Sequence, residues 1–97
     1  MSAQGQATVF APAGALTMVS APAVLEDGRE LARAGDLVVD FAAVTVADSA
    51  ALALLLDWTR CARAAGNRLV VRSLPAGMAS LAALYDIDPL LPLEPAQ

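Results

Sequence analysis

The chain has 97 residues, of which 58% are hydrophobic, and its ten acids and six bases give a formal net charge of −4 at pH 7. We expect a single domain over residues 1–97, because this length supports one core and leaves no room for a second, catalytic domain. The negative charge opposes binding to nucleic acid, and the longest uninterrupted apolar run, residues 50–56, is far shorter than the ~20 residues that span a bilayer.

The N-terminal sequence MSAQGQATVF lacks the basic start and the apolar core of a signal peptide. The single cysteine, Cys61, has no partner for an internal disulfide, which agrees with a reducing compartment. We therefore expect a cytoplasmic protein.

The first part of the chain predicts a strand, a turn, a helix and another strand. Residues 8–11 are β-prone and lead into a turn at PAGALT, residues 12–17. Ser20 offers a capping hydroxyl for an amphipathic helix that Gly35 ends. Residues 36–41, DLVVDF, are too continuously apolar for a half-exposed strand, so we expect a strand that is buried on both faces.

The rest of the chain continues this alternation. Asp48 is predicted to cap a helix over residues 49–65, which the following Gly-Asn pair ends. Residues 68–74 predict the next strand, Pro75 opens a shorter helix, and the prolines of the tail prevent further regular helix. Alternating strands and helices predict an α/β fold in which right-handed crossovers join neighbouring parallel strands and helices pack against the sheet.

The sequence lacks the usual residues of a catalytic or metal site. It contains no histidine and no lysine, which removes the commonest general base and metal ligand and the lysine of a phosphate-binding loop. The acids are scattered, and none of the closest pairs belongs to a Gly-rich calcium loop. We therefore expect no enzymatic activity, no metal and no cofactor.

Helical periodicity divides residues 49–65 into two faces. A broad apolar arc is predicted to cover the sheet and contains Ala51, Leu54, Leu55, Trp58, Cys61, Ala62 and Ala65. A narrower stripe consists of Ser49, Leu52, Ala53, Leu56, Arg60 and Arg63. Two interpretations of the stripe remain open: Leu52 and Leu56 are the flank of the core, or the whole stripe is a surface that another protein covers.

Ser49 itself has two interpretations. Serine is common at helix starts because its hydroxyl caps free backbone N–H groups, so Ser49 could simply be a second cap after Asp48. Alternatively, Ser49 is a docking or phosphorylation site, because a helix N-terminus tolerates added negative charge and a phosphate there would change the contact surface.

The motif LVVDFAAVTVADSAALALLLDWTRCARAAGNRLVV, with GALT before it and MASLAALYDI after it, resembles the STAS domain of sulfate transporters and anti-sigma-factor antagonists. The similarity covers nearly the whole chain and implies a STAS-like mixed sheet with helices packed against it. Asp48 matches the family's acid, and Ser49 matches the hydroxyl that is phosphorylated in the antagonists and contacts the ATPase in transporter subunits. Ala51 stands where the family usually has glycine, so we expect its methyl group to narrow the approach of a partner or kinase.

The resemblance implies two functions that use the same surface. In the first, the chain is a non-catalytic subunit of a phospholipid-transport ABC complex, binds and supports the ATPase subunit, and is peripheral to the inner membrane through that complex. In the alternative, it is an anti-sigma-factor antagonist that a partner kinase regulates by phosphorylating Ser49. The high apolar content favours the lasting complex of the first function.

Overall fold

The computed structural model describes residues 7–93, which form short strands, three α-helices and one 3₁₀ turn. The strands are β1 (Thr8–Phe10), β2 (Gly14–Leu16), β3 (Leu37–Asp40), β4 (Val44–Ala47) and β5 (Leu69–Arg72). The helices are α1 (Ala21–Ala34), α2 (Ser49–Ala64) and α3 (Ala76–Leu84), followed by the 3₁₀ turn η1 (Asp88–Leu90). The predicted α/β alternation is confirmed.

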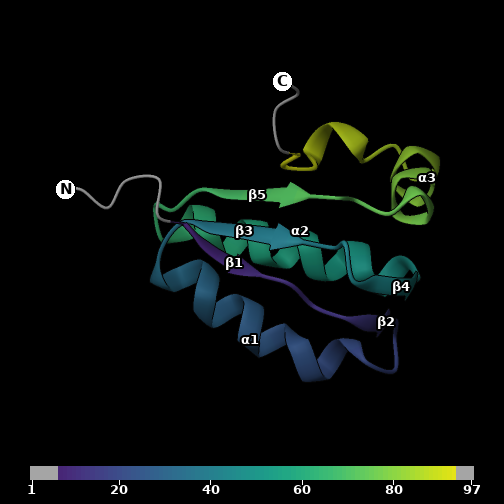
Figure 1. Cartoon of the computed structure of the whole chain (residues 1–97). Helices are drawn as coiled ribbons and strands as arrows, with labels where there is room; N and C mark the ends of the chain where they lie inside the picture. The colour runs from purple at the N-terminus through teal and green to yellow at the C-terminus, as the bar shows by residue number, and fades with distance from the viewer. Residues whose placement is uncertain (1–6, 94–97) are drawn as a thin grey trace.

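The strands form two parallel sheets. One has the order β1-β3-β5, with Val38 paired to Val9 on one side and to Val70 on the other, and the second pairs β2 with β4. In Figure 1, the backbone continues from β1 into β2 and from β3 into β4. The small sheet therefore continues the large one beyond a short interruption between each of these two pairs of strands. Every strand pairing within residues 7–93 is parallel, which is more uniform than the mixed sheet that the family resemblance implies.

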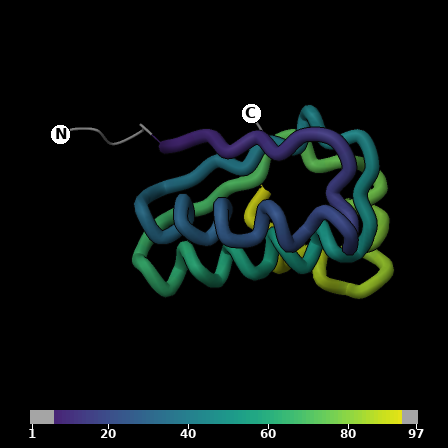
Figure 2. Tube along the Cα trace, turned by 90° about the horizontal axis from the view of Figure 1, so that it is seen from below, coloured from purple at the N-terminus to yellow at the C-terminus, as the bar shows by residue number. Residues whose placement is uncertain are grey.

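Helices α1 and α2 lie side by side on the same face of the sheet (Figures 1 and 2). This arrangement corrects the prediction that the strand at residues 36–41 is buried on both faces. Leu37 and Val39 point to the covered face and are buried, whereas Val38 and Asp40 are half-buried. Both long crossover helices pack on one side, so only alternate residues of β3 reach the core.

The core lies between α2 and the sheet and is centred on Trp58, whose side chain is fully buried. Its indole Nε1 donates a hydrogen bond of 3.0 Å to the Leu25 carbonyl, and Phe10 meets the ring edge-on with centroids 5.5 Å apart. Such a pair satisfies the only polar group of the indole while burying its apolar surface. Five members of the predicted core arc are buried as expected: Ala51, Leu54, Leu55, Trp58 and Ala62.

The other two members of that arc differ from the prediction. Cys61 is half-buried, and Ala65 is exposed and lies just beyond the end of the helix at Ala64. Ala65 is the C-cap, and its N–H bonds back to carbonyls of the last turn. The helix therefore ends one residue earlier than predicted, and Gly66 directly follows the C-cap with a φ of 78°, the left-handed conformation that glycine favours at a helix end.

Two strands were missed by the sequence patterns. Residues 12–17 were predicted as a turn, but Gly14–Leu16 form β2, and Val44–Ala47 form its partner β4. Pro12 and Gly14 give residues 12–17 the pattern of a turn, and the pairing of β2 with β4 depends on a partner about thirty residues away in the chain. No helix within residues 7–93 is long and apolar enough to cross a membrane.

Candidate functional site

Asp48 joins the start of α2 to the loop that follows β2. Its Oδ1 accepts a hydrogen bond of 2.8 Å from the backbone N–H of Ala50, which makes Asp48 the N-cap residue of α2. Its Oδ2 accepts a bond of 3.2 Å from the backbone N–H of Met18. A single carboxylate thus satisfies a free helix N–H and also holds the 17–20 loop beside the helix start.

Ser49 is the first residue of α2 and is exposed. Within residues 7–93 its hydroxyl makes no hydrogen bond, because the capping bond comes from Asp48. The hydroxyl therefore faces solvent at the positive end of the helix dipole, where an added negative charge or a partner's acceptor is favourable.

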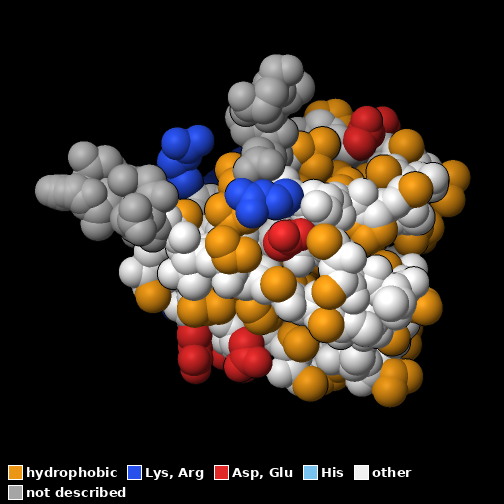
Figure 3. All heavy atoms as spheres, viewed as in Figure 1, with side chains coloured by type: hydrophobic (Ala, Val, Ile, Leu, Met, Phe, Trp, Pro, Cys, Tyr) orange, Lys and Arg blue, Asp and Glu red, His pale blue; other side chains and the backbone are white. Residues whose placement is uncertain are grey.

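The loop beside Ser49 presents apolar side chains to solvent. Met18 is 75% exposed and Val19 is 92% exposed, and a few hydrophobic atoms are visible among polar ones at the lower right of the space-filling view, where this loop lies (Figure 3). Ser20 organises the loop, since its hydroxyl accepts from the Thr17 N–H and donates to the Ala15 carbonyl. The sequence patterns did not predict a role for Met18 and Val19. The feature that could have indicated one is an adjacent pair of large apolar side chains inside a polar turn.

Ser20 also differs from its predicted role. It stands at the N-cap position of α1, but its side chain makes no capping bond to the helix. The hydroxyl is already engaged with the preceding loop, where Thr17 and Ala15 are its partners. Ser20 therefore shapes the loop next to Ser49 and does not cap the helix.

The predicted stripe on α2 is only partly a surface. Ser49, Ala53, Arg60 and Arg63 are exposed and Leu56 is half-buried. Leu52 is 2% exposed and belongs to the core, so its assignment to the contact surface was wrong. At about 100° per residue, Leu52 lies only about 20° around the helix axis from Thr59, which is also buried. We call the remaining residues, Ser49, Ala53, Leu56, Arg60 and Arg63, the α2 stripe.

Ala51 does not narrow the approach to Ser49. Its side chain is fully buried against the sheet side of α2, so its methyl group is out of reach of any partner. The expectation that this alanine restricts a partner or kinase is therefore wrong. Side chains two positions apart on a helix point in nearly opposite directions, which is why Ser49 is exposed while Ala51 is buried.

An ion pair borders the stripe on the side of α1. Arg29 of α1 donates from Nε to Asp57 Oδ2 at 2.7 Å and from Nη2 to Asp57 Oδ1 at 3.1 Å. Its Nη1 also bonds Glu26 at 2.7 Å. The hydrogen bonds from Arg29 hold the pKa of the Asp57 carboxyl below its usual value, and the same bonds raise the pKa of Arg29. The fork fixes α1 against α2 beside a shallow groove lined by Ala21, Leu25, Ala50, Ala53 and Leu54.

These features form a surface suited to protein contact. The α2 stripe supplies a hydroxyl, aliphatic side chains and two guanidinium groups, and the 17–20 loop adds Met18 and Val19 next to its N-terminal end. Among the residues that the structure describes, no three His, Cys, Asp or Glu side chains lie close enough to hold a metal ion. The chemistry available at the surface is hydrogen bonding, ion pairing and apolar burial.

Comparison with known proteins identifies the type of domain. A family model described as "Mlab, STAS domain" matches residues 1–92. The fold is similar to that of the anti-sigma factor antagonist SpoIIAA in its unphosphorylated form, with a TM-score of 0.66 and 13% identity over 92% of this chain and 79% of that chain. At this identity the likeness concerns the fold alone. No curated protein matches the sequence.

Proposed function

The chain belongs to the STAS family, and on that premise we propose that it is a non-catalytic subunit of a phospholipid-transport ABC complex that binds the ATPase subunit through the α2 stripe. The name of the matching family model, Mlab, favours the transporter function over the other functions of the family. In this proposal the protein is cytoplasmic and reaches the inner membrane only through its complex.

The environment of Ser49 is the observation that carries the proposal. Its hydroxyl is exposed and unbonded within residues 7–93, while Asp48 already caps the helix. A serine needed only for capping would form a hydrogen bond with a backbone group of the first helical turn. The free hydroxyl of Ser49 therefore supports a role in contact with another molecule. Met18 and Val19 beside it supply the apolar area that a lasting interface buries.

The alternative is an anti-sigma-factor antagonist that is switched by phosphorylation of Ser49. Two observations support it: the fold resembles that of an antagonist, and the Ser49 hydroxyl is accessible at a helix N-terminus. A phosphate there would add about −1.5 to −2 charges next to the Asp48 carboxylate and would change the surface that a kinase or target contacts.

Co-purification separates the two functions. The tagged chain is expressed with the ABC ATPase from its own genome and, separately, with an anti-sigma kinase from that genome. The proposal expects a stable complex with the ATPase, weakened by Ser49→Glu and unchanged by Asp27→Ala on α1. Retention of the kinase instead, with ATP-dependent phosphorylation that Ser49→Ala abolishes, would establish the alternative and reject the transporter function.

A further inference from the structure

Two adjoining depressions lie between α2 and the C-terminal part of the described chain. The first is lined by Leu56, Thr59, Arg60, Arg63 and Leu90. The second is lined by Thr59, Arg63, Asn67, Arg68, Leu69, Val70, Pro92 and Leu93. Because they share Thr59 and Arg63, they form one groove between α2 and the C-terminal segment, which we call the arginine groove.

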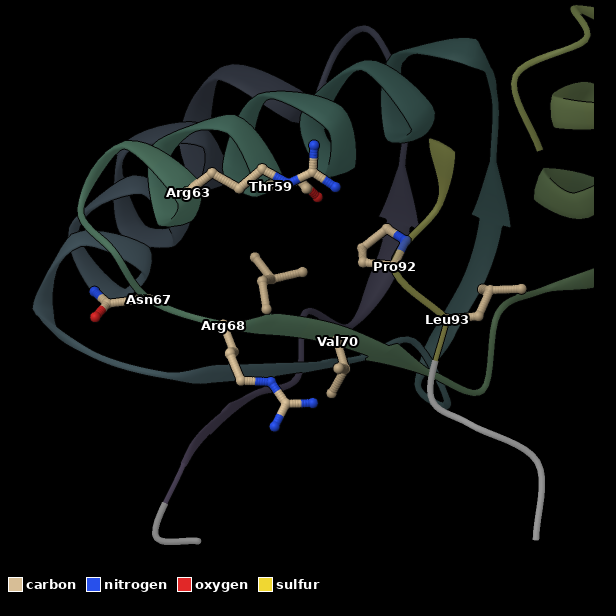
Figure 4. A pocket seen from close by; sticks show the side chains of 8 residues that line it. Thr59, Arg63, Asn67, Arg68, Val70, Pro92 and Leu93 are labelled. Carbon is tan, nitrogen blue, oxygen red and sulfur yellow. The ribbon is translucent and has the colours of Figure 1, made fainter. Parts of the chain in front are cut away.

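The charge of this groove is one-sided. Arg60 and Arg63 are exposed, and within residues 7–93 neither makes a hydrogen bond or an ion pair. None of the described residues that line the groove is acidic, although the chain as a whole carries a net charge of −4. Figure 4 shows Arg63 extended along α2 toward Pro92, while Arg68 and Val70 extend from β5 away from α2. Two of the three arginines that line the groove, Arg60 and Arg63, therefore belong to α2, and the third, Arg68, precedes β5.

Aliphatic side chains form much of the rest of the groove, which also includes Thr59, Asn67 and Arg68. Leu56 is half-buried on α2, and Leu90 and Leu93 on the opposite wall are 59% and 50% exposed. Thr59 donates its hydroxyl proton to the Leu55 carbonyl at 2.7 Å, so it offers no free donor to a ligand. The groove thus combines aliphatic walls with two guanidinium groups one helical turn apart, a pattern that complements an apolar segment bearing carboxylates.

We propose that the arginine groove receives an acidic, apolar segment of the ATPase subunit, whose carboxylates pair with Arg60 and Arg63 and whose aliphatic side chain lies between Leu56 and Leu90. The identity of the partner rests on the proposed function, but the chemistry of the segment follows from the groove. A basic segment would meet the like charge of Arg60 and Arg63, and a fully polar one would leave the leucines exposed to water.

The test measures the dissociation constant between the full chain and the ATPase from the same genome by titration calorimetry at low and at physiological salt. The double variant Arg60→Glu/Arg63→Glu is expected to bind at least about tenfold more weakly, and Arg60→Gln/Arg63→Gln to bind less tightly and with a smaller salt dependence than the unmodified chain. Arg33→Glu is the matched control, because Arg33 is also an exposed arginine in the last turn of a helix but lies on α1. It is expected to stay within about twofold of the unmodified chain.

The outcomes distinguish this inference from the proposed function. If the ATPase binds the unmodified chain and the folded double variants equally well, the groove proposal is wrong and docking is confined to the Ser49 end of the α2 stripe. If the ATPase does not bind the unmodified chain at all, the proposed function fails and this inference fails with it. Co-sedimentation of the same variants with phosphatidylglycerol vesicles is measured in parallel. If the variants lose binding only to these vesicles and keep the ATPase, the groove recognises lipid headgroups and the proposed segment is rejected. Thermal unfolding of each variant, followed by circular dichroism, confirms that the fold is retained.

Discussion

The indole ring of Trp58 lies directly against the backbone of Gly28, so a β-carbon at position 28 would overlap ring atoms Cε2 and Nε1. Gly28 is buried inside α1, where glycine is otherwise unfavourable by about 1 kcal/mol relative to alanine. The close approach of α1 to Trp58 explains why the helix contains a glycine there. It also allows the Trp58 Nε1 to reach the Leu25 carbonyl in the same helix.

Gly28→Ala is therefore expected to lower the free energy of unfolding by about 1–3 kcal/mol, because overpacking of the indole outweighs the gain in helix propensity. The matched control is Gly77→Ala in α3, where an added β-carbon meets no atom within 4 Å. That variant should be neutral or more stable by up to about 1 kcal/mol. Urea denaturation measures both. Equal stability of Gly28→Ala and the unmodified chain would show that α1 lies further from Trp58.

Trp58→Ala should destabilise the fold by about 3–5 kcal/mol, because it removes the largest fully buried side chain together with its contact to Phe10. The denaturation midpoint in urea gives the loss. Tyr85→Ala, which removes an aromatic side chain that is 52% exposed, serves as the control and should change stability much less. An unchanged midpoint for Trp58→Ala would mean that the core is placed wrongly.

Asp48→Ala should cost more stability than Ser49→Ala, although the two residues are adjacent. Asp48 accepts from both Ala50 and Met18, and losing the cap alone costs about 1 kcal/mol. Ser49→Ala removes a hydroxyl without a partner in residues 7–93 and should stay within about 0.5 kcal/mol of the unmodified chain. Melting temperatures compare the two. A larger loss for Ser49→Ala would show that Ser49 is the structural cap.

Substitutions at the adjacent residues Leu52 and Ala53 are expected to affect different properties, the first the stability of the fold and the second the binding of the ATPase. Leu52→Ala should destabilise the fold by about 2–5 kcal/mol, because Leu52 is buried in the core. Ala53→Asp, on the exposed α2 stripe, should leave the melting temperature nearly unchanged. It should weaken co-purification of the ATPase, because it places an unpaired carboxylate in the proposed interface. If Ala53→Asp retains the ATPase at the level of the unmodified chain, the α2 stripe is not the docking surface.

The Arg29–Asp57 pair predicts how stability depends on pH. The pKa of Asp57 is lowered in the folded protein, so the pair's contribution is present above the unfolded carboxyl pKa of about 3.9 and is lost as pH falls through the lower folded value. Arg29 stays protonated in both states over this range and adds no pH dependence. The stability difference between the unmodified chain and Asp57→Asn should therefore shrink as the pH falls from about 6 toward 3.

Asp27→Asn is the control for that measurement, since Asp27 is exposed on α1 and makes no ion pair within the described residues. Its stability difference from the unmodified chain should change less with pH. A difference for Asp57→Asn that stays constant from pH 6 to about pH 3 would show that the fork does not stabilise the folded state.

Much of the region around the candidate site could be predicted from local patterns. The cap at Asp48, the helix from Ser49 and the buried positions of Leu54, Leu55 and Trp58 follow from one capping residue and a 3.6-residue period. These features depend on residues within a few positions of one another. The sequence therefore indicates these features without information about how the helix is placed in the fold.

Other features were decided only by contacts between distant segments. The pairing of β2 with β4, the burial of Leu52 and the need for glycine at position 28 each depend on a partner that lies far away in the chain or on the far side of the helix. Met18 and Val19 join Ser49 because the Asp48 carboxylate bonds the Met18 N–H across thirty positions. The period of a helix fixes which residues share a face, but the sheet and neighbouring helices determine how wide the covered part of that face is.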